Sequence, residues 1–400
     1  MTGSSEHEAS SNRTPVARLW LAVFIGYTAL GATIQSLPGY ITDVRGGGVV
    51  ISGLAIGIAF LATAVTRPFA GMLADARDPR PVVVAGGLLT ALGGLGHLIA
   101  PDLIVLMIAR IVMGAGEGAL FSASLPWVLR GADTHRRGRV AGWFGLSMWS
   151  GLSVGPLVAA LIVGPLGYPA VWWLVAGLGA TAAALVTSTR SPTPQPGQGA
   201  ARLLGSGLHN RLLPRAAIAP GMAFGLSSFG YGTIAALAVL FLDGRNAAAA
   251  SVVLTVFAVV FLLVRTLGSP LVDTYGGDRV GQVAVLIEVL GLVVVAISPT
   301  AAVTLLGVAL AGAGLALTYP STVWMTLHRA TSDTIGSSVG VMNSFWDLGI
   351  MFAGAIGGFV AATLGFPAAF WIAAASGVLS VAVIRLYVAR SARVRPGPAT

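Results

Sequence analysis

Four ionisable residues stand inside long apolar stretches of the sequence, and their types decide what chemistry is available there: Arg110, Glu117, Glu288 and Asp347. If those stretches span a membrane, a charge at the bilayer centre costs about 2.5–3.5 kcal/mol even on the lenient insertion scale. Residues kept there at such a cost are functional candidates. A carboxyl group can bind and release a proton, and we therefore predict proton binding at Glu117 first and at Asp347 second.

Spacing assigns supporting roles around these carboxyl groups. Arg110 precedes Glu117 by seven residues, which puts both on one helix face about two turns apart. We expect Arg110 to tune the proton affinity of Glu117; a structural polar pair is the alternative. Asp347 follows Asn343 by four residues, and the alternatives to a proton site are a counter-charge for a cationic substrate and a hydrogen-bonded structural carboxylate. For Glu288 a structural role is favoured.

The composition indicates that lipid is the solvent of most of the surface. Of 400 residues, 56% are hydrophobic and 9% are charged, and the mean hydropathy is +0.86. A soluble chain carries roughly 25% charged residues, so the composition excludes a soluble enzyme, a nucleic-acid-binding domain and a disordered chain. The sequence has no Cys and no Lys, and its five His residues lack metal-ligand spacing. We therefore predict no metal, no cofactor, no phosphate-binding loop for ATP, no nucleic-acid partner and no enzymatic activity.

Apolar runs long enough to cross a membrane, about 20 residues each, divide the chain. Twelve are present, near 18–42, 49–74, 81–100, 103–129, 139–164, 168–189, 215–242, 248–272, 280–298, 302–328, 335–363 and 367–388. They predict an all-α membrane protein of 12 transmembrane helices in two pseudo-symmetric six-helix bundles. The predicted units are an N-terminal tail (1–17), a first bundle (18–189), a Pro- and Gly-rich linker (190–214), a second bundle (215–388) and a C-terminal tail (389–400).

The arginines predict the orientation in the membrane. Of the 23 basic residues, all Arg, 20 lie at the termini, in the linker, or in and beside every second connection. The other connections carry only Arg45 and Arg245. Positive charge favours the cytoplasmic side, so both termini are predicted to be cytoplasmic and the protein to lie in the inner cell membrane. The polar residues 1–14 give no sign of a cleaved signal peptide.

An internal repeat relates the two halves at an offset of 198 residues. Arg67 and Asp75 map onto Arg265 and Asp273. The other matches at this offset are Gly114–Gly116 with Gly312–Gly314, Gly151 with Gly349, and Ala159–Ala160 with Gly357–Gly358. Duplicated halves of this kind are typical of transporters whose binding site lies between the halves near the membrane midplane.

Three motifs resemble the major facilitator superfamily over essentially the whole chain. The segment R-P-F-A-G-M-L-A-D (67–75) is similar to the loop between the family's helices 2 and 3, and R-I-V-M-G-A-G-E-G (110–118) is similar to its helix-4 motif. Gly142, Gly151, Gly155 and Pro156 resemble the helix-5 motif of proton-coupled exporters, with Ala159 and Ala160 in place of its last two glycines. We expect Gly155 and Pro156 to shape helix 5 against helix 8.

The resemblance implies roles for two further sets of residues. Charged residues at the cytoplasmic mouth would act as a gate, or merely cap their helices: Arg67, Asp75, Arg77, Arg80, Arg265 and Asp273. Aromatic and polar residues on the cavity helices would contact an apolar or cationic substrate: Tyr27, Gln35, Trp127, Trp149, Tyr231, Tyr319, Trp324, Asn343 and Trp346.

The resulting prediction is a monomeric secondary active transporter that exports a small organic molecule, such as a drug or metabolite, in exchange for protons. This would be an efflux protein of the multidrug-resistance kind in contact with membrane lipid. An importer of a sugar or other nutrient, by proton symport or uniport, is the alternative. A non-transporting membrane sensor or scaffold is the remote one.

Overall fold

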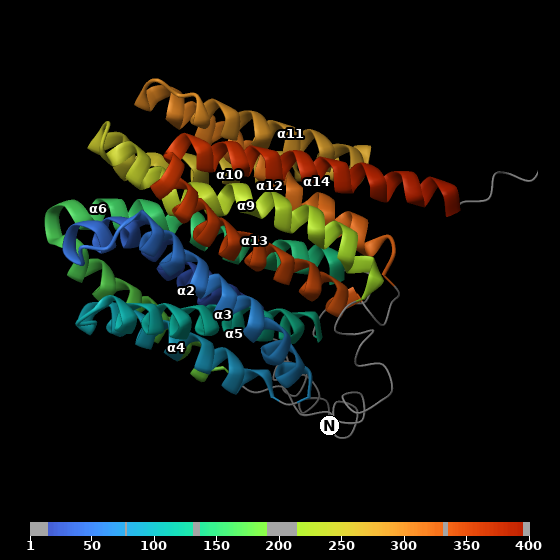
Figure 1. The fold of residues 1–400 in the computed structure, drawn as a ribbon. Coiled ribbons are helices and arrows are strands. Elements are labelled where there is room, and N and C mark those ends of the chain that lie inside the picture. The colour runs from blue at the N-terminus through green and yellow to red at the C-terminus, as the bar shows by residue number, and fades with distance from the viewer. Residues whose placement is uncertain (1–14, 77, 131–136, 190–213, 331–334, 395–400) are drawn as a thin grey trace, which may run out of the picture.

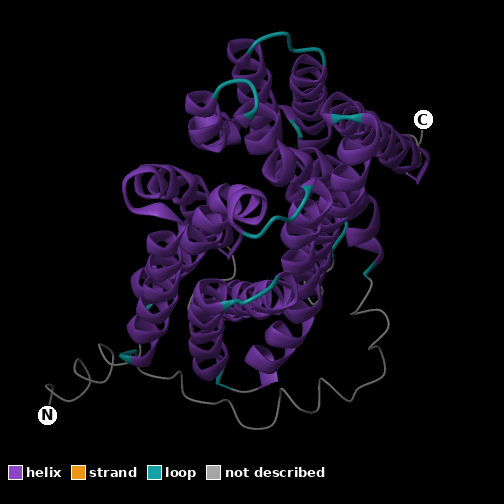
Figure 2. Cartoon of the chain, turned by 60° about the vertical axis from the view of Figure 1, so that its left-hand side comes forward, coloured by secondary structure: helices purple, strands orange, loops and turns teal. Residues whose placement is uncertain are grey.

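The chain folds into long helices joined by short connections (Figures 1 and 2). The computed structural model describes residues 15–76, 78–130, 137–189, 214–330 and 335–394, and this part of the chain contains helices and no strand. The elements are α2 (Val16–Gly39), η1 (Tyr40–Val44), α3 (Val49–Ala76), α4 (Pro79–Ile99), α5 (Leu103–Arg130), α6 (Arg137–Thr187), α9 (Arg215–Asp243), α10 (Ala247–Tyr275), α11 (Gly277–Ala296), α12 (Ala301–Leu327), α13 (Ile335–Leu364) and α14 (Phe366–Val394).

Eleven of the described helices are long and apolar enough to span a membrane, where the sequence predicts twelve. The difference lies in α6, whose 51 residues cover the runs predicted at 139–164 and 168–189. Gly167 interrupts it with φ 75° and ψ 176°, a conformation that favours glycine, between Pro165 and Pro169. Helical turns continue up to this break from both sides, so the two predicted runs form two helical arms that meet at a kink at Gly167 with no loop between them.

Contacts show that α6 doubles back at this break. Near its beginning, the carbonyl of Trp143 accepts a hydrogen bond from the indole of Trp20. Just after its end, the carbonyl of Ser188 accepts one from Arg18, which also lies at the start of α2. At the break, Tyr168 instead donates to Asp43, beyond the end of α2. Both ends of α6 therefore lie at the same end of the molecule, and its break lies at the other.

We call the end that holds the starts of α2, α4 and α6 and the ends of α3 and α5 the arginine-rich side. Arg80, at the start of α4, donates to the carbonyl of Thr187 at the end of α6. Arg130, at the end of α5, donates to the carbonyl of Ala74 at the end of α3. This is the side predicted to be cytoplasmic, and that orientation stays a prediction.

Short polar side chains begin several of the helices. Asp78 accepts a hydrogen bond from the Arg80 backbone N–H (3.0 Å) ahead of Pro79, the first residue of α4. Asn246 accepts from Ala249 at the start of α10 (3.0 Å). These caps satisfy N–H groups that have no partner inside the helix. After the apolar runs of α3 and α9 end, a capping residue therefore marks where the next helix begins.

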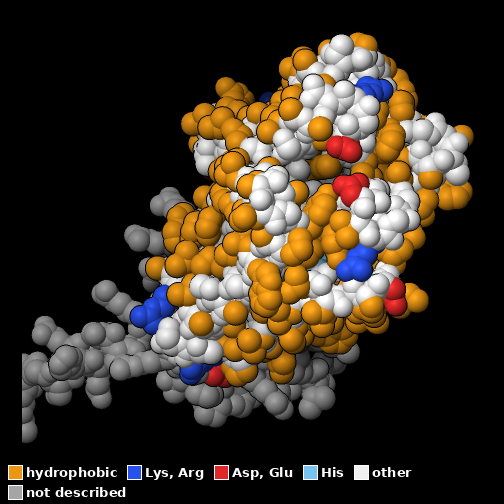
Figure 3. Space-filling model, turned by 90° about the vertical axis from the view of Figure 1, so that its left-hand side faces the viewer, with side chains coloured by type: hydrophobic (Ala, Val, Ile, Leu, Met, Phe, Trp, Pro, Cys, Tyr) orange, Lys and Arg blue, Asp and Glu red, His pale blue; other side chains and the backbone are white. Residues whose placement is uncertain are grey.

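Large apolar side chains cover much of the outside, as expected of a surface in lipid. Ile104, Leu161 and Leu267 are among those exposed, and in the view of Figure 3 charged side chains are few among hydrophobic and uncharged polar ones. In Figure 1, α2 to α5 occupy the lower part of the molecule and α10, α11, α12 and α14 the upper part, with α9 and α13 between them. The predicted domain boundaries stay predictions, and residues 1–14, 190–213 and 395–400 lie outside the described part.

Glycines allow the closest approaches between helices. A Cβ on Gly53 of α3 would lie 2.1 Å from the carbonyl oxygen of Gly354 in α13, so these two helices meet backbone to backbone. On α6, a Cβ on Gly151 or Gly155 would lie 2.4 Å from a carbonyl oxygen of α2. Gly151 and Gly155 thus pack against the first helix, while Pro156 lines the space between α6 and α10; the predicted shaping of helix 5 against helix 8 stays a prediction.

Candidate functional site

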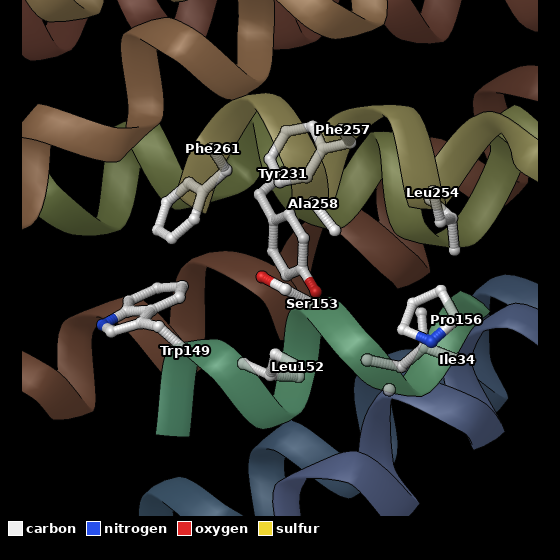
Figure 4. A pocket seen from close by; sticks show the side chains of 11 residues that line it. Ile34, Trp149, Leu152, Ser153, Pro156, Tyr231, Leu254, Phe257, Ala258 and Phe261 are labelled. Carbon is white, nitrogen blue, oxygen red and sulfur yellow. The ribbon is translucent and has the colours of Figure 1, made fainter. Parts of the chain in front are cut away.

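A cavity lies between α2, α6, α9 and α10, and so between helices from both ends of the sequence (Figure 4). Its volume is about 20 Å³, room for about one water molecule, so the helices are closely packed around it in the described conformation. The residues that line it are apolar, aromatic or hydroxyl-bearing: Gly31, Ile34, Trp149, Leu152, Ser153, Pro156, Tyr231, Leu254, Phe257, Ala258 and Phe261. None of these lining residues carries a charge.

Two hydroxyl groups face this space. Figure 4 shows the hydroxyl ends of Tyr231 and Ser153 near each other in the middle of the cavity, from opposite walls. Tyr231 is 8% exposed and Ser153 is 9% exposed, and among the described residues neither hydroxyl has a hydrogen-bond partner. Both hydroxyls can donate and accept hydrogen bonds, so both are available to hydrogen-bond to a bound molecule.

An aromatic cluster closes the arginine-rich end of the cavity. The Trp149 ring lies 4.7 Å from that of Phe261 and 5.2 Å from that of Trp346, centroid to centroid. Trp346 stacks on Tyr231 (5.5 Å), and Trp149 meets Tyr319 edge to face (6.1 Å). Of the nine predicted cavity residues, Trp149 and Tyr231 line the cavity, and Tyr319 and Trp346 pack directly behind it.

The buried ion pair of the site joins Arg67 of α3 to Asp347 of α13. Arg67 Nε lies 2.5 Å and its Nη2 3.2 Å from the two carboxylate oxygens, a two-point contact in which both side chains are buried. The pair connects residues 280 positions apart. We predicted Arg67 as a gate residue and Asp347 as a proton site, without predicting that they bind each other.

Glu117 lies next to this pair. It is buried on α5, and its Oε1 has no hydrogen-bond partner among the described residues. Its charge interacts with those of Arg110, Arg67 and Asp347. Tyr27 donates to the backbone carbonyl of Glu117 (3.3 Å). The structure therefore brings both predicted proton sites and one predicted gate residue into a single buried cluster.

This cluster lies on the arginine-rich side of the cavity. Along α2, Tyr27 precedes the cavity residues Gly31 and Ile34. Along α6, Phe144, whose ring stacks on Phe121 beside Arg67, precedes Trp149. Since both helices start on the arginine-rich side, the charges stand between that side and the cavity.

Arg110 does not form an ion pair with Glu117 in the described part of the chain. Its Nε donates to the Ala55 carbonyl (2.9 Å) and its Nη1 to the Met113 sulfur (3.5 Å), while its Nη2 has no partner there. Arg110 thus ties α5 to α3 and acts on Glu117 only through its charge. The predicted tuning role stays a prediction.

The remaining predicted gate residues are not gathered together. Arg265 is buried; it donates to the Ala316 carbonyl (3.2 Å) and lies over the Tyr319 ring. Asp273 is exposed near the end of α10. Arg77 and the side chain of Asp75 lie outside the described part of the structure. The gate formed by the repeated Arg and Asp residues therefore stays a prediction.

Gln35 bridges the two sets of helices on the opposite side of the cavity. Its side-chain amide donates to the carbonyls of Ala250 and Ser251 at the start of α10, at 3.4 Å each. Cross-contacts thus lie on both sides of the cavity. The other predicted cavity residues lie off its wall: Trp127 is buried in α5, the Trp324 ring contacts that of His328, and Asn343 is buried on α13.

Sequence reasoning missed most of the wall on α10. Leu254, Phe257, Ala258 and Phe261 recur at spacings of three and four, the pattern of one helix face. This pattern was available in the sequence but was indistinguishable from ordinary packing in an apolar helix. Ser153 was missed although it lies between Gly151 and Gly155 of the helix-5 motif.

Glu288 is buried on α11, and the structural role favoured for it stays a prediction. Ser227 of α9 donates a hydrogen bond to its Oε2, and a Cβ added to Gly230 would lie 2.5 Å from its Oε1. The carboxyl group thus lies between α9 and α11, and Glu288 is not among the residues that line the cavity.

Comparison with known proteins agrees with this architecture. The model of the Major Facilitator Superfamily matches residues 19–244 and 221–400. An uncharacterised MFS-type transporter of Burkholderia pseudomallei is 30% identical over 381 residues, covering 93% of this chain and 91% of that protein. The nucleoside transporter NupG has the same fold at 13% identity with a TM-score of 0.74, covering 93% of this chain and 98% of that one. The xylose transporter XylE from E. coli matches at 16% identity with a TM-score of 0.74 and the same coverage.

Proposed function

Because the chain belongs to the Major Facilitator Superfamily of multi-pass membrane transporters, we propose that it exports a small organic molecule in exchange for protons by alternating access. The observation that carries the proposal is the buried Arg67–Asp347 pair, which joins α3 to α13 between the cavity and the arginine-rich side, with Glu117 beside it. An acid whose partner lies in the other half of the chain can link protonation to the facing of the cavity.

In the proposed cycle, protonation of Asp347 neutralises the carboxylate that holds Arg67. The ionic contact across the arginine-rich side is then lost, and α3 and α13 are free to separate there. Glu117 provides a second carboxyl group within range of Arg67, so a proton or a positive charge can be exchanged between the two acids. On the opposite side, the Gln35 bonds to α10 must break when the cavity opens that way.

The proton gradient is strong enough for this task. One pH unit supplies about 1.4 kcal/mol per proton, and a membrane potential of about 100 mV adds about 2.3 kcal/mol per charge moved. Together they can shift the equilibrium between two facings by more than about a hundredfold, since about 1.4 kcal/mol corresponds to a factor of ten. Exchange rather than symport is supported by the resemblance of Gly151, Gly155 and Pro156 to the exporters' helix-5 motif.

A second candidate function is import by symport or uniport, favoured by the fold shared with a nucleoside and a xylose transporter. The sign of an imposed pH gradient separates the candidates. With the full chain in liposomes, exchange accumulates a substrate in the acidic compartment, symport accumulates it in the alkaline compartment, and uniport ignores the gradient. These signs hold whichever way the protein is inserted.

The experiment uses a panel of labelled organic anions, cations and neutral compounds, with protein-free liposomes to correct for passive trapping. We expect at least one compound to accumulate in an acidic lumen, and Glu117→Gln to abolish the dependence on pH. Accumulation in an alkaline lumen would establish symport instead. Unchanged pH-driven exchange in Glu117→Gln would remove Glu117 from the coupling mechanism.

The location in the inner membrane with cytoplasmic termini, and the monomeric state, are parts of the same proposal. They rest on the distribution of arginine along the sequence and on family resemblance.

A further inference from the structure

Arg265 is a buried cation without an acidic partner among the described residues. It is 4% exposed, and its Nη1 donates to the Ala316 carbonyl at 3.2 Å. Its guanidinium carbon lies 4.9 Å from the centroid of the Tyr319 ring. The nearest acid along its own helix, Asp273, is eight residues away, about 12 Å along the axis, and is exposed. In the described part of the chain the one ion pair is that of Arg67 and Asp347.

A guanidinium group keeps its positive charge in proteins, and burying it without a counter-charge is costly. A backbone carbonyl and an aromatic ring offset part of that cost. A carboxylate is a stronger partner, because it accepts two parallel hydrogen bonds and neutralises the charge. Arg265 is therefore prepared to bind an anion more strongly than the groups that it now contacts.

Arg265 stands beside the cavity. It follows Phe261, a cavity-lining residue, by one helical turn on α10, about 6 Å along the axis. The ring beneath its guanidinium, Tyr319, is in edge contact with Trp149, another cavity-lining residue. The cation thus lies just beyond the aromatic cluster at the arginine-rich end of the cavity.

A second donor without a partner occurs at the same end. The indole Nε1 of Trp149 is buried and has no hydrogen-bond partner among the described residues. In Figure 4, this nitrogen lies at the end of the Trp149 ring that is remote from the hydroxyls of Tyr231 and Ser153, on the side where α10 continues past Phe261. Indole and guanidinium nitrogens donate only, so this end of the site is suited to an acceptor group, and above all to an anion.

The residues that line the cavity indicate the chemical character of the rest of the ligand. Its wall is formed by the rings of Trp149, Tyr231, Phe257 and Phe261 and by aliphatic side chains, with the two hydroxyls as its polar groups. Such a wall suits an apolar, ring-bearing body. One unpaired guanidinium balances one negative charge, which fits a carboxylate better than a dianionic phosphate.

We propose that the transported molecule is an aromatic carboxylate whose anionic group binds Arg265 and whose apolar body packs on the neighbouring rings when the cavity widens during alternating access. The proposal rests on the proposed function in one respect, that the cavity is the transport site. It replaces the expectation of a cationic substrate, because Arg265 repels a cation and the carboxylate of Asp347 is already bound by Arg67.

The test compares three probes that share one ring system and differ in charge: 2-naphthoate, 2-naphthol and 2-naphthyltrimethylammonium. Their binding to the purified full-length chain in detergent is measured by calorimetry at neutral pH. We expect 2-naphthoate to bind at least about tenfold more tightly than either other probe. Arg265→Gln should remove this advantage without weakening the binding of 2-naphthol, and Arg265→Lys should retain part of it.

Arg245 offers a matched control. It also donates to a backbone carbonyl, that of Ser298 (3.0 Å), and lies over a ring, that of Phe241 (4.1 Å), but it is exposed at the other end of α10. Arg245→Gln should leave the binding of all three probes unchanged. If Arg265→Gln does not fold, two measurements still test the proposal. They are the ranking of the three probes on the unmodified chain and the binding of 2-naphthoate to Arg265→Lys.

Three results overturn the proposal: 2-naphthol or the ammonium probe binds the unmodified chain as tightly as 2-naphthoate, folded Arg265→Gln keeps the preference, or no probe binds. Its failure differs from failure of the proposed function. Binding of 2-naphthoate that needs Arg265, combined with no response to a pH gradient in liposomes, leaves the anion site standing and removes proton exchange. Proton-driven transport of the ammonium probe that does not depend on Arg265 would support proton exchange and would remove the anion site.

Discussion

Arg67 and Arg265 occupy equivalent positions in the two halves, 198 residues apart, and their surroundings are alike in one respect and opposite in another. Each lies against an aromatic ring, Phe121 at 5.8 Å for Arg67 and Tyr319 at 4.9 Å for Arg265. These two rings are also 198 residues apart. The repeat therefore preserves an arginine on an aromatic ring in each half.

The two halves differ in what neutralises the arginine. Arg67 binds Asp347, which comes from the other half. The position equivalent to Asp347 in the first half, 198 residues earlier, is Trp149. The repeat therefore has an indole in the first half where the second half has the carboxylate. The same scaffold thus pairs one arginine with an acid, while the other has no acidic partner in the described part of the chain.

The largest effect is expected from removing the acid of the paired side. Asp347→Asn leaves Arg67 buried without its partner, and breaking a buried ion pair in this way costs about 3–5 kcal/mol of stability. We expect this loss of unfolding free energy in detergent, together with loss of pH-driven transport. The double variant Arg67→Gln/Asp347→Asn should recover much of the stability but none of the coupling. A single variant as stable as the unmodified chain would show that the pair is not maintained in the resting protein.

The next largest effect is a difference in pH-driven transport between variants of two buried glutamates, whose surroundings differ. Glu117 interacts with Arg67 and Asp347 at the contact between halves, whereas Glu288 bonds to Ser227 within the second half. We expect Glu117→Gln to lower pH-driven transport in liposomes by at least about tenfold, which corresponds to about 1.4 kcal/mol of coupling. Glu288→Gln, the matched control, should retain that transport. Equal losses in both variants would mean that coupling does not depend on the Arg67–Asp347 contact.

A smaller effect concerns the rings beneath the arginines. Arg265 relies on Tyr319 more than Arg67 relies on Phe121, because Arg67 also has a carboxylate. Cation–π contacts contribute about 0.5–2 kcal/mol, the most where water is excluded. We therefore expect Tyr319→Leu to destabilise the protein by about 1 kcal/mol more than Phe121→Leu, as measured by thermal unfolding in detergent. The opposite order would imply that Arg265 has another counter-charge.

The fold was largely predictable because its cause is simple. Runs of about 20 apolar residues must form helices in lipid, where the backbone has to satisfy its own hydrogen bonds. The count differed at one place, where Gly167 turns the chain without a polar connection between the arms of α6. Hydropathy locates spans, but it does not reveal whether a loop or a single glycine separates them.

The site was predicted as a set of residues rather than as an arrangement. Burial cost alone identified Glu117 and Asp347 as candidates. The pairing of Asp347 with Arg67 depends on how α3 meets α13, where Gly53 and Gly354 let the backbones touch. Contacts between residues 280 positions apart leave no periodic signal in one sequence. For the same reason the Arg265 environment was read as part of a gate, since its repeated Asp273 was visible and Tyr319 was not.

The smallest predicted effect isolates the residue that replaces the acid in the first half. Trp149→Phe keeps an aromatic ring at the cavity wall and removes the unpartnered indole N–H. A hydrogen bond of this kind contributes about 0.5–1.5 kcal/mol, so we expect the affinity for 2-naphthoate to fall about two- to tenfold, with 2-naphthol affected less. Trp172 provides the control, because its Nε1 is also buried without a partner in the described chain, but its ring packs on His97 and Tyr40 away from the cavity lining. If Trp172→Phe weakens 2-naphthoate as much as Trp149→Phe does, the loss reflects looser packing of the helices rather than a donor at the anion. If only Trp149→Phe weakens the binding of 2-naphthoate, the indole N–H of Trp149 donates to the bound carboxylate. The residue that stands in the first half at the position of Asp347 then serves a ligand instead of an arginine.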